Sequence, residues 1–133
     1  MAWLLDTDIC IYIIKRRPSW VAERLAAIPP GEVAISAVTL FELQAGVEKS
    51  AHPERNRRAL EHFAYPLDLI PFDEIAAHMA ARVRADLERR GCPIGPYDVQ
   101  IAATALAHGL TLVSNNTREF GRIDGLVLEN WVE

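Results

Sequence analysis

The sequence predicts an α/β protein with a central, mostly parallel sheet of four to five strands flanked by helices. Short apolar runs at residues 2–5, 33–35 and 110–113 have the length and composition of buried parallel strands. The segments between them carry the capping residues and prolines that mark helix ends. Each run also ends at a polar or acidic position, which is typical of the sheet edge where α/β proteins bind ligands.

Strands are expected wherever a short apolar segment is bounded by turn residues. Three are the apolar runs named above, and two weaker segments add an extended stretch and an edge strand. The five expected strands cover residues 2–5, 33–35, 67–72, 110–113 and 126–128.

Helices are expected where periodic apolar residues lie between start and stop signals. Ser36 and Asp73 are placed as N-caps, Pro96 suits the first turn of a helix, and Pro18 and Gly91 end one. The first helix begins near Thr7 or Asp8, and Ser19 is expected to cap the second. The six expected helices cover residues 9–14, 20–28, 37–49, 52–63, 74–90 and 99–108.

The helix after Asp73 is expected to pack against the core through one stripe of side chains. Ile75, Met79, Val83 and Leu87 recur every four residues, with Ala76 and Ala80 beside them, which is the spacing of one helix face. Near the end of the chain, Trp131 is expected to pack over the core.

Composition narrows the class of protein. The 133 residues suit one domain, and a net charge of -4 excludes a generally basic nucleic-acid coat. Cys10 and Cys92 form no disulfide framework or zinc motif, which fits the reducing cytosol. Asp6 and Asp8 interrupt the first apolar run, which argues against a signal peptide. No apolar stretch is long enough to span a membrane.

Four acidic residues far apart in the sequence are expected to meet at one edge of the sheet. Asp6 ends the first strand, Glu42 follows the second, Asp98 heads a late helix and Glu119 follows the strand at 110–113. Clustered carboxylates repel each other and raise each other's pKa values. A hard divalent cation with oxygen ligands, Mg²⁺ or Mn²⁺, resolves this repulsion.

Each acid also has a purely structural interpretation. Asp6 or Asp8 can serve simply as the N-cap of the first helix. Glu42 can be a solvated helix residue. Asp98, in the first turn of a helix, is favoured there by the helix dipole alone.

The combination of these segments resembles the PIN-domain ribonucleases, specifically toxins of the VapC type, over essentially the whole chain. The matching segments are residues 5–9, 36–43, 93–98 and 114–120. The resemblance implies a single PIN domain over residues 1–133 that acts as a Mg²⁺-dependent endoribonuclease on structured RNA, often tRNA. Such toxins form dimers and are held inactive in larger complexes by an antitoxin of the VapB type.

The resemblance also implies roles for the acids. Asp6 and Asp98 match the principal metal ligands of the family, and Glu42 matches its third acid. Many PIN domains carry a fourth acid where Asn116 aligns, and here Glu119 is the carboxylate available nearby. Whether Asn116 or Glu119 completes the site, and whether it holds one metal or two, is left open by the sequence.

Uncharged neighbours are implied to support these acids. Thr7 and Ser114 are expected to position ligands or water by hydrogen bonds, together with Asn116. Asp8 stands where the family commonly has Asn, and it is expected to be a helix cap instead of a ligand.

The implied reaction is metal-assisted hydrolysis, with Glu42 or Glu119 orienting the water or accepting its proton. It needs no pair of histidines, and we interpret the four present as surface or packing residues, namely His52, His62, His78 and His108. Affinity for RNA requires basic side chains, and the candidates are Lys15, Arg16, Arg17, Arg82, Arg84, Arg89, Arg90 and Arg118.

Two other functions fit parts of the sequence. The Asp-x-Asp segment at residues 6–8 matches haloacid-dehalogenase-like phosphatases, but neither Lys15 nor Lys49 follows a suitable strand and residues 114–116 lack the acids of that family. The second alternative is a catalytically silent PIN-like binding or dimerisation module, in which the acids pair with an arginine of a partner.

Overall fold

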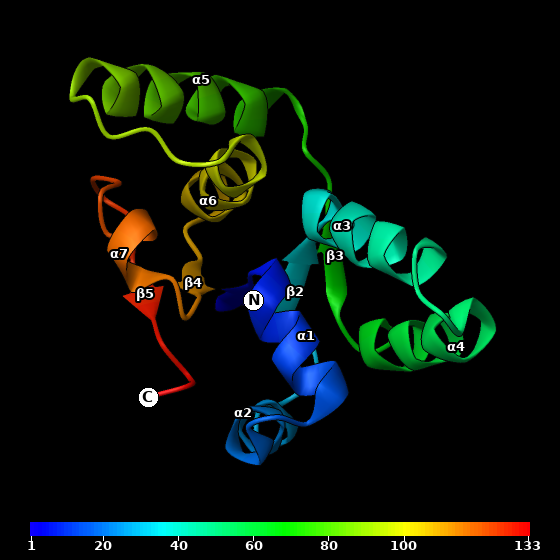
Figure 1. The fold of residues 1–133 in the computed structure, drawn as a ribbon. Coiled ribbons are helices and arrows are strands. Elements are labelled where there is room, and N and C mark those ends of the chain that lie inside the picture. The colour runs from blue at the N-terminus through cyan, green and yellow to red at the C-terminus, as the bar shows by residue number, and fades with distance from the viewer.

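A five-stranded sheet in the order β3-β2-β1-β4-β5 runs through the centre of the computed structural model, which describes residues 1–133 (Figure 1). Every neighbouring pair of strands is parallel, so the expected sheet is confirmed with five strands. The strands are β1 (Trp3–Leu5), β2 (Val33–Ser36), β3 (Asp68–Ile70), β4 (Thr111–Val113) and β5 (Leu128–Glu129).

Seven helices connect and cover the strands (Figure 1). They are α1 (Thr7–Lys15), α2 (Ser19–Ala26), α3 (Ala37–Glu48), α4 (Pro53–Ala64), α5 (Glu74–Arg89), α6 (Pro96–His108) and the single turn α7 (Thr117–Phe120). None of them has the length and apolar character needed to cross a bilayer.

Alternation along the strands divides the core between the two faces of the sheet. Leu4, Ala34 and Leu112 point to one face, where they pack with α5 and α6. Leu5 and Ile35 point to the other face, where they pack with α1, α2 and α4. The sheet therefore lies between two helical layers, as expected for parallel strands that are apolar on both faces.

The register of the central strands brings their ends to one level. Leu5 of β1 pairs with Ile35 of β2 on one side and with Val113 of β4 on the other. The residues that follow these ends, Asp6 and Ser114, therefore lie beside each other at the carboxyl edge of the sheet.

The expected core-facing stripe of α5 is partly wrong. Ile75 is 65% exposed, whereas Ala76 and Ala80 are buried together with Val83 and Leu87. A helix turns about 100° per residue, so a strict four-residue row drifts by about 40° at each step. The row that packs against the core at Leu87 has therefore turned away from the core at Ile75, whereas Ala76 and Ala80 are buried as expected.

Three further expectations at element ends are corrected. Ser19 does not cap α2 but is its first residue, and Pro18 occupies the N-cap position without a side-chain hydrogen bond. The last strand begins at Leu128 and not at residue 126. The loop after β4 contains α7, which is a turn too short to leave a periodic pattern in the sequence. Trp131 is 1% exposed, as expected.

Candidate active site

Asp6 is the buried centre of the site. The residue is 4% exposed, and its Oδ1 accepts a hydrogen bond of 2.8 Å from the backbone N–H of Ile9. Asp6 is thus the N-cap of α1, as one interpretation of the sequence held. The cap uses only Oδ1 of the carboxylate. The capping role therefore does not by itself exclude a role for Asp6 as a metal ligand.

The environment of Asp6 disfavours its charge. Burial raises the pKa of Asp6 to about 7, although the Ser114 side chain and the Ile9 N–H both act to lower it. The negative charges of Asp8 and Asp98 raise it further. A buried carboxylate surrounded by other carboxylates is a group whose ionised form gains strongly from a nearby cation.

Asp98 has the same character and comes from a different helix. It lies in the first turn of α6, which Pro96 begins. Burial raises its pKa to about 6, and the charges of Glu42, Glu119 and Asp8 add to the shift. The structure therefore brings all four predicted acids, together with Asp8, into one electrostatic cluster.

Glu42 is held in place by α1. The Thr7 hydroxyl donates a hydrogen bond of 2.7 Å to Oε1 of Glu42 and lies 3.2 Å from Oγ1 of Thr39. Thr39 is fully buried, and its N–H is capped by Ser36 at 3.0 Å. The sequence argument found Thr7 but missed Thr39, whose only signal is its place three residues after the helix cap.

Asn116 and Glu119 have different roles in the loop after β4. Oδ1 of Asn116 accepts from the N–H of Glu119 at 3.4 Å and caps α7, while the Asn116 N–H donates to Oγ of Ser114 at 2.9 Å. The charge of Glu119, by contrast, acts on Asp98. Glu119 is therefore the acid that this loop contributes to the cluster, and Asn116 shapes the loop.

The expectation that Asp8 is a helix cap is wrong, because Asp6 caps α1. Asp8 lies in the first turn of α1 with an exposed side chain, and its charge raises the pKa of both Asp6 and Asp98. The position of Asp8, two residues after Asp6, was a signal in the sequence that its charge would act on the cluster.

The cluster has no positive partner of its own. Every charge that acts on the pKa of Asp6 or Asp98 comes from another carboxylate, and no lysine or arginine is among them. The donors are oxygens, which hard divalent cations prefer. No three Asp, Glu, His or Cys side chains are close enough to share a metal ion in this conformation. A bound cation would therefore draw the carboxylates closer together.

Two of the candidate RNA-binding cations are already paired with acids. Arg84 pairs with Glu88 and Arg90 with Asp86, both along α5. Lys15 is exposed and forms no ion pair, and it lines a groove together with Glu42. All four histidines are exposed, which confirms that they are surface residues.

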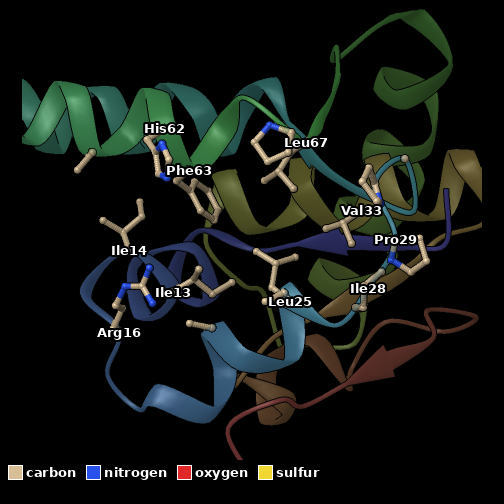
Figure 2. A pocket seen from close by; sticks show the side chains of 16 residues that line it. Ile13, Ile14, Arg16, Leu25, Ile28, Pro29, Val33, His62, Phe63 and Leu67 are labelled. Carbon is tan, nitrogen blue, oxygen red and sulfur yellow. The ribbon is translucent and has the colours of Figure 1, made fainter.

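Two grooves lie between α1 and α4. The first, of about 480 Å³, is lined mainly by apolar side chains of α1, α2 and α4, including Ile14, Leu25 and Phe63, which converge on one hollow in Figure 2. The second, of about 350 Å³, lies between α1, α3 and α4 and reaches Glu42. Ile14 and Ala59 line both grooves, so the two grooves adjoin at these side chains.

Residues 3–126 match the family described as the PIN domain. The chain is 46% identical over 131 residues, 98% of each chain, to the tRNA(fMet)-specific endonuclease VapC of Shigella flexneri. It is similar to the crystal structure of DNA-bound VapBC from Salmonella typhimurium, with a TM-score of 0.93, 43% identity and 98% of each chain covered. It is also similar to VapBC2 from Rickettsia felis bound to a promoter DNA fragment, with a TM-score of 0.92, 39% identity and coverage of 98% of this chain and 99% of that one.

Proposed function

The chain belongs to the PIN domain family, and we propose that it is a VapC-type endoribonuclease toxin that hydrolyses structured RNA, with tRNA as its substrate class. The family match spans residues 3–126, and we propose that residues 1–133 form a single PIN domain. The observation that carries the proposal is the cluster of carboxylates around Asp6 and Asp98, which lacks a positive partner within the chain.

Nucleases of this family generally depend on a divalent metal ion. We propose Mg²⁺, with Mn²⁺ as a substitute, held by Asp6 and Asp98. The oxygen donors and the raised pKa values of these two acids support this assignment. When bound, such an ion supplies positive charge for the phosphate and activates water for attack.

The chain's own residues supply orientation and proton transfer. Glu42 or Glu119 orients the attacking water or accepts its proton, and Thr7 fixes the direction of the Glu42 carboxylate. Ser114 supports Asp6 and Asn116 shapes the loop that carries Glu119. In-line attack on the phosphodiester leaves a 5′-phosphate and a 3′-hydroxyl, and it requires no 2′-hydroxyl chemistry.

An antitoxin of the VapB type is the proposed protein partner, since similar chains were solved as VapBC complexes. The groove in Figure 2 suits an apolar segment of that partner, and the second groove, which adjoins it at Ile14 and Ala59, reaches Glu42. A basic residue there would pair with Glu42 or Asp98 and compete with the metal. We further propose a homodimer within a larger toxin–antitoxin complex, located in the cytoplasm, where the free thiols of Cys10 and Cys92 stay reduced.

The test is cleavage of total tRNA by the chain purified free of any partner, with Mg²⁺ and with EDTA. Asp98→Asn should abolish cleavage. Asp68→Asn, which changes an exposed acid at the start of β3, is the matched control and should cut normally. Discrete fragments that require both the metal and Asp98 support the proposal, and cleavage by Asp98→Asn would remove Asp98 from the site.

Two alternatives were compatible with the sequence. Membership of the PIN domain family removes the phosphatase. The catalytically silent binding module predicts a folded chain that leaves RNA intact, while Asp6→Asn and Asp98→Asn weaken only the binding of a partner. The tRNA assay and a pull-down with the antitoxin therefore separate that module from the nuclease.

A further inference from the structure

We propose that Phe41 and Tyr97 form a stacking platform for an unpaired nucleobase next to the scissile phosphate of the RNA. The two residues come from different helices, α3 and α6, and each directly precedes one of the acids of the cluster. This inference rests on the proposed ribonuclease function and adds to it the group that holds the substrate's base.

The two rings contact each other between α3 and α6. Their centroids are 5.6 Å apart, and their planes meet at 71° in an edge-to-face pair. Phe41 directly precedes Glu42 on α3, and Tyr97 directly precedes Asp98 on α6. The ring pair therefore spans the same two helices that bring these acids together.

The pair contributes little to the core. Phe41 is 52% exposed and Tyr97 is 44% exposed, so a large part of each side chain faces solvent. The other aromatic pair, Trp3 with Trp131, also meets edge to face, but Trp131 is 1% exposed and belongs to the core. Packing therefore accounts for the tryptophan pair and leaves the exposed faces of Phe41 and Tyr97 without a structural role.

Stacking is the interaction that an acidic surface can offer to RNA. The chain has a net charge of -4, and carboxylates surround the site, so general electrostatic attraction for phosphate is weak. Proteins hold unpaired bases by stacking them on aromatic side chains, which is independent of base sequence. The charge of Glu42 acts on Asp98, and the rings that precede these two acids are in contact with each other. The acid pair and the ring pair therefore lie between the same two helices, and a phosphate held at the acids would bring a neighbouring base to the rings.

The surroundings favour a nucleotide over a second copy of the chain as the occupant. The rings are flanked by Glu42 and Asp98 and, one turn along, by the exposed Gln44. Protein interfaces exclude charged residues from their centres, because burying unpaired carboxylates is costly. A nucleotide avoids that cost, because its phosphate and the proposed cation would lie at the carboxylates while its base covers the rings.

The first experiment measures steady-state cleavage of a tRNA(fMet) transcript with Mg²⁺. Tyr97→Leu and Phe41→Leu keep an apolar side chain but remove the aromatic face, and each should raise KM about tenfold or more while changing kcat less. Tyr97→Phe keeps the aromatic face and should stay within about twofold of the parent chain. Tyr65→Leu, at an aromatic residue that is 91% exposed and has no aromatic neighbour, is the matched control and should leave KM unchanged.

The second experiment removes the other half of the stack. The cleavage site is mapped on the transcript, and the nucleotides on either side are replaced in turn by an abasic nucleotide in a synthetic RNA. If Tyr97 stacks on one of these bases, removing that base and substituting Tyr97→Leu should each weaken RNA binding. The two changes together should weaken binding no further than either change alone.

Three results would overturn the platform while leaving the nuclease intact. These are an unchanged KM for both leucine variants, additive effects of the abasic site and Tyr97→Leu, or a loss of dimer mass by light scattering that accounts for the rise in KM. The last result would assign the rings to a contact between copies. Absence of cleavage by the parent chain on any RNA would instead contradict the proposed function.

Discussion

The Thr7 hydroxyl donates a hydrogen bond of 2.7 Å to Oε1 of Glu42 and so ties the first turn of α1 to α3. These two helices follow neighbouring strands, β1 and β2, across the carboxyl edge of the sheet. The bond fixes the direction of a carboxylate that would otherwise rotate freely at a half-exposed position.

Removing this bond should slow catalysis without unfolding the chain. Thr7→Val keeps the shape of the side chain but deletes the donor, and a hydrogen bond to a charged group contributes about 1.5–3 kcal/mol. We expect kcat for tRNA cleavage to fall about tenfold or more, while Thr7→Ser, which keeps the hydroxyl, should stay close to the parent chain. Equal loss in both variants would show that the methyl group matters and not the bond.

The stability of the metal-free protein should fall as pH rises through the titration range of Asp6. The folded pKa is about 7 and the ordinary value is 3.8, so the folded state binds more protons than the unfolded state between these values. The free energy of unfolding therefore decreases from about pH 4 to pH 7, by a few kcal/mol in order of magnitude, and stays level above. Asp98 adds a smaller decrease that ends near pH 6.

Asp6→Asn should reduce this pH dependence, because its side chain stays neutral and can still accept from the Ile9 N–H. Urea denaturation in EDTA at several pH values measures the effect. An unchanged slope in the variant would mean that Asp6 is not the group whose charge is disfavoured.

Divalent cations should stabilise the chain more at pH 8 than at pH 5. Both Asp6 and Asp98 are ionised at the higher pH and become acceptors for a cation. A ligand at one hundred times its Kd stabilises the folded state by about 2.7 kcal/mol. We expect Mg²⁺ or Mn²⁺ to raise Tm by several degrees at pH 8, and Asp98→Asn to remove most of that rise. A rise that survives in Asp98→Asn would place the binding elsewhere.

Glu129 should be a stability residue outside the site. Its carboxylate accepts from the indole N–H groups of Trp3 at 3.2 Å and Trp131 at 2.9 Å, and it pairs with Arg24, which also lies over the Trp131 ring. Burial alone would raise the pKa of Glu129, but these partners outweigh it and lower the pKa. Its contribution is therefore present at neutral pH and is lost as pH falls through the lowered pKa.

Glu129→Ala leaves the buried indole N–H of Trp131 without a partner. We expect the free energy of unfolding at pH 7 to fall by about 1–3 kcal/mol, with kcat unchanged. Glu23→Ala, at an exposed acid of α2, is the control and should change stability by less than about 0.5 kcal/mol. A fall of equal size in both variants would contradict the role given to the Trp131 bond.

Glycine at position 46 should favour binding of the antitoxin at a cost to the stability of α3. It lies inside α3, where glycine costs about 1 kcal/mol relative to alanine, and a Cβ added there would meet no atom of the chain within 4 Å. It also lines the groove beside Glu42. Gly46→Ala should therefore raise Tm by a few degrees while weakening the affinity for the antitoxin. Calorimetric titration would measure that affinity. Unchanged affinity would mean that the antitoxin does not pass over Gly46.

Two of the acids were predictable from position alone, because one follows the end of a strand, one lies in the first turn of a helix, and parallel strands end at one edge. Asp6 and Asp98 needed only that rule. Spacing alone misplaced Ile75, since a four-residue row drifts around a helix. The Phe41–Tyr97 contact could not be predicted from the sequence either, because it depends on how α3 and α6 approach each other.

The division of work between Asn116 and Glu119 also required the structure. Both are polar residues in one loop, and the sequence left open which of them completes the site. The difference arises from α7, a single turn whose N-cap occupies the Asn116 oxygen while the Glu119 charge reaches Asp98. Thr39 was missed for a similar reason, because its burial follows from packing between α1 and α3 and not from any motif.

The central strand β1 has its partners far apart along the chain, since Leu5 pairs with both Ile35 and Val113. Such a topology has high contact order, and folding must close a long loop before β4 can dock. Asp6 sits at the end of β1 and Glu119 follows β4, so these two acids can meet only once β4 has docked. An incompletely folded chain therefore carries no assembled nuclease, and a host cell is exposed to cleavage only by molecules that have finished folding.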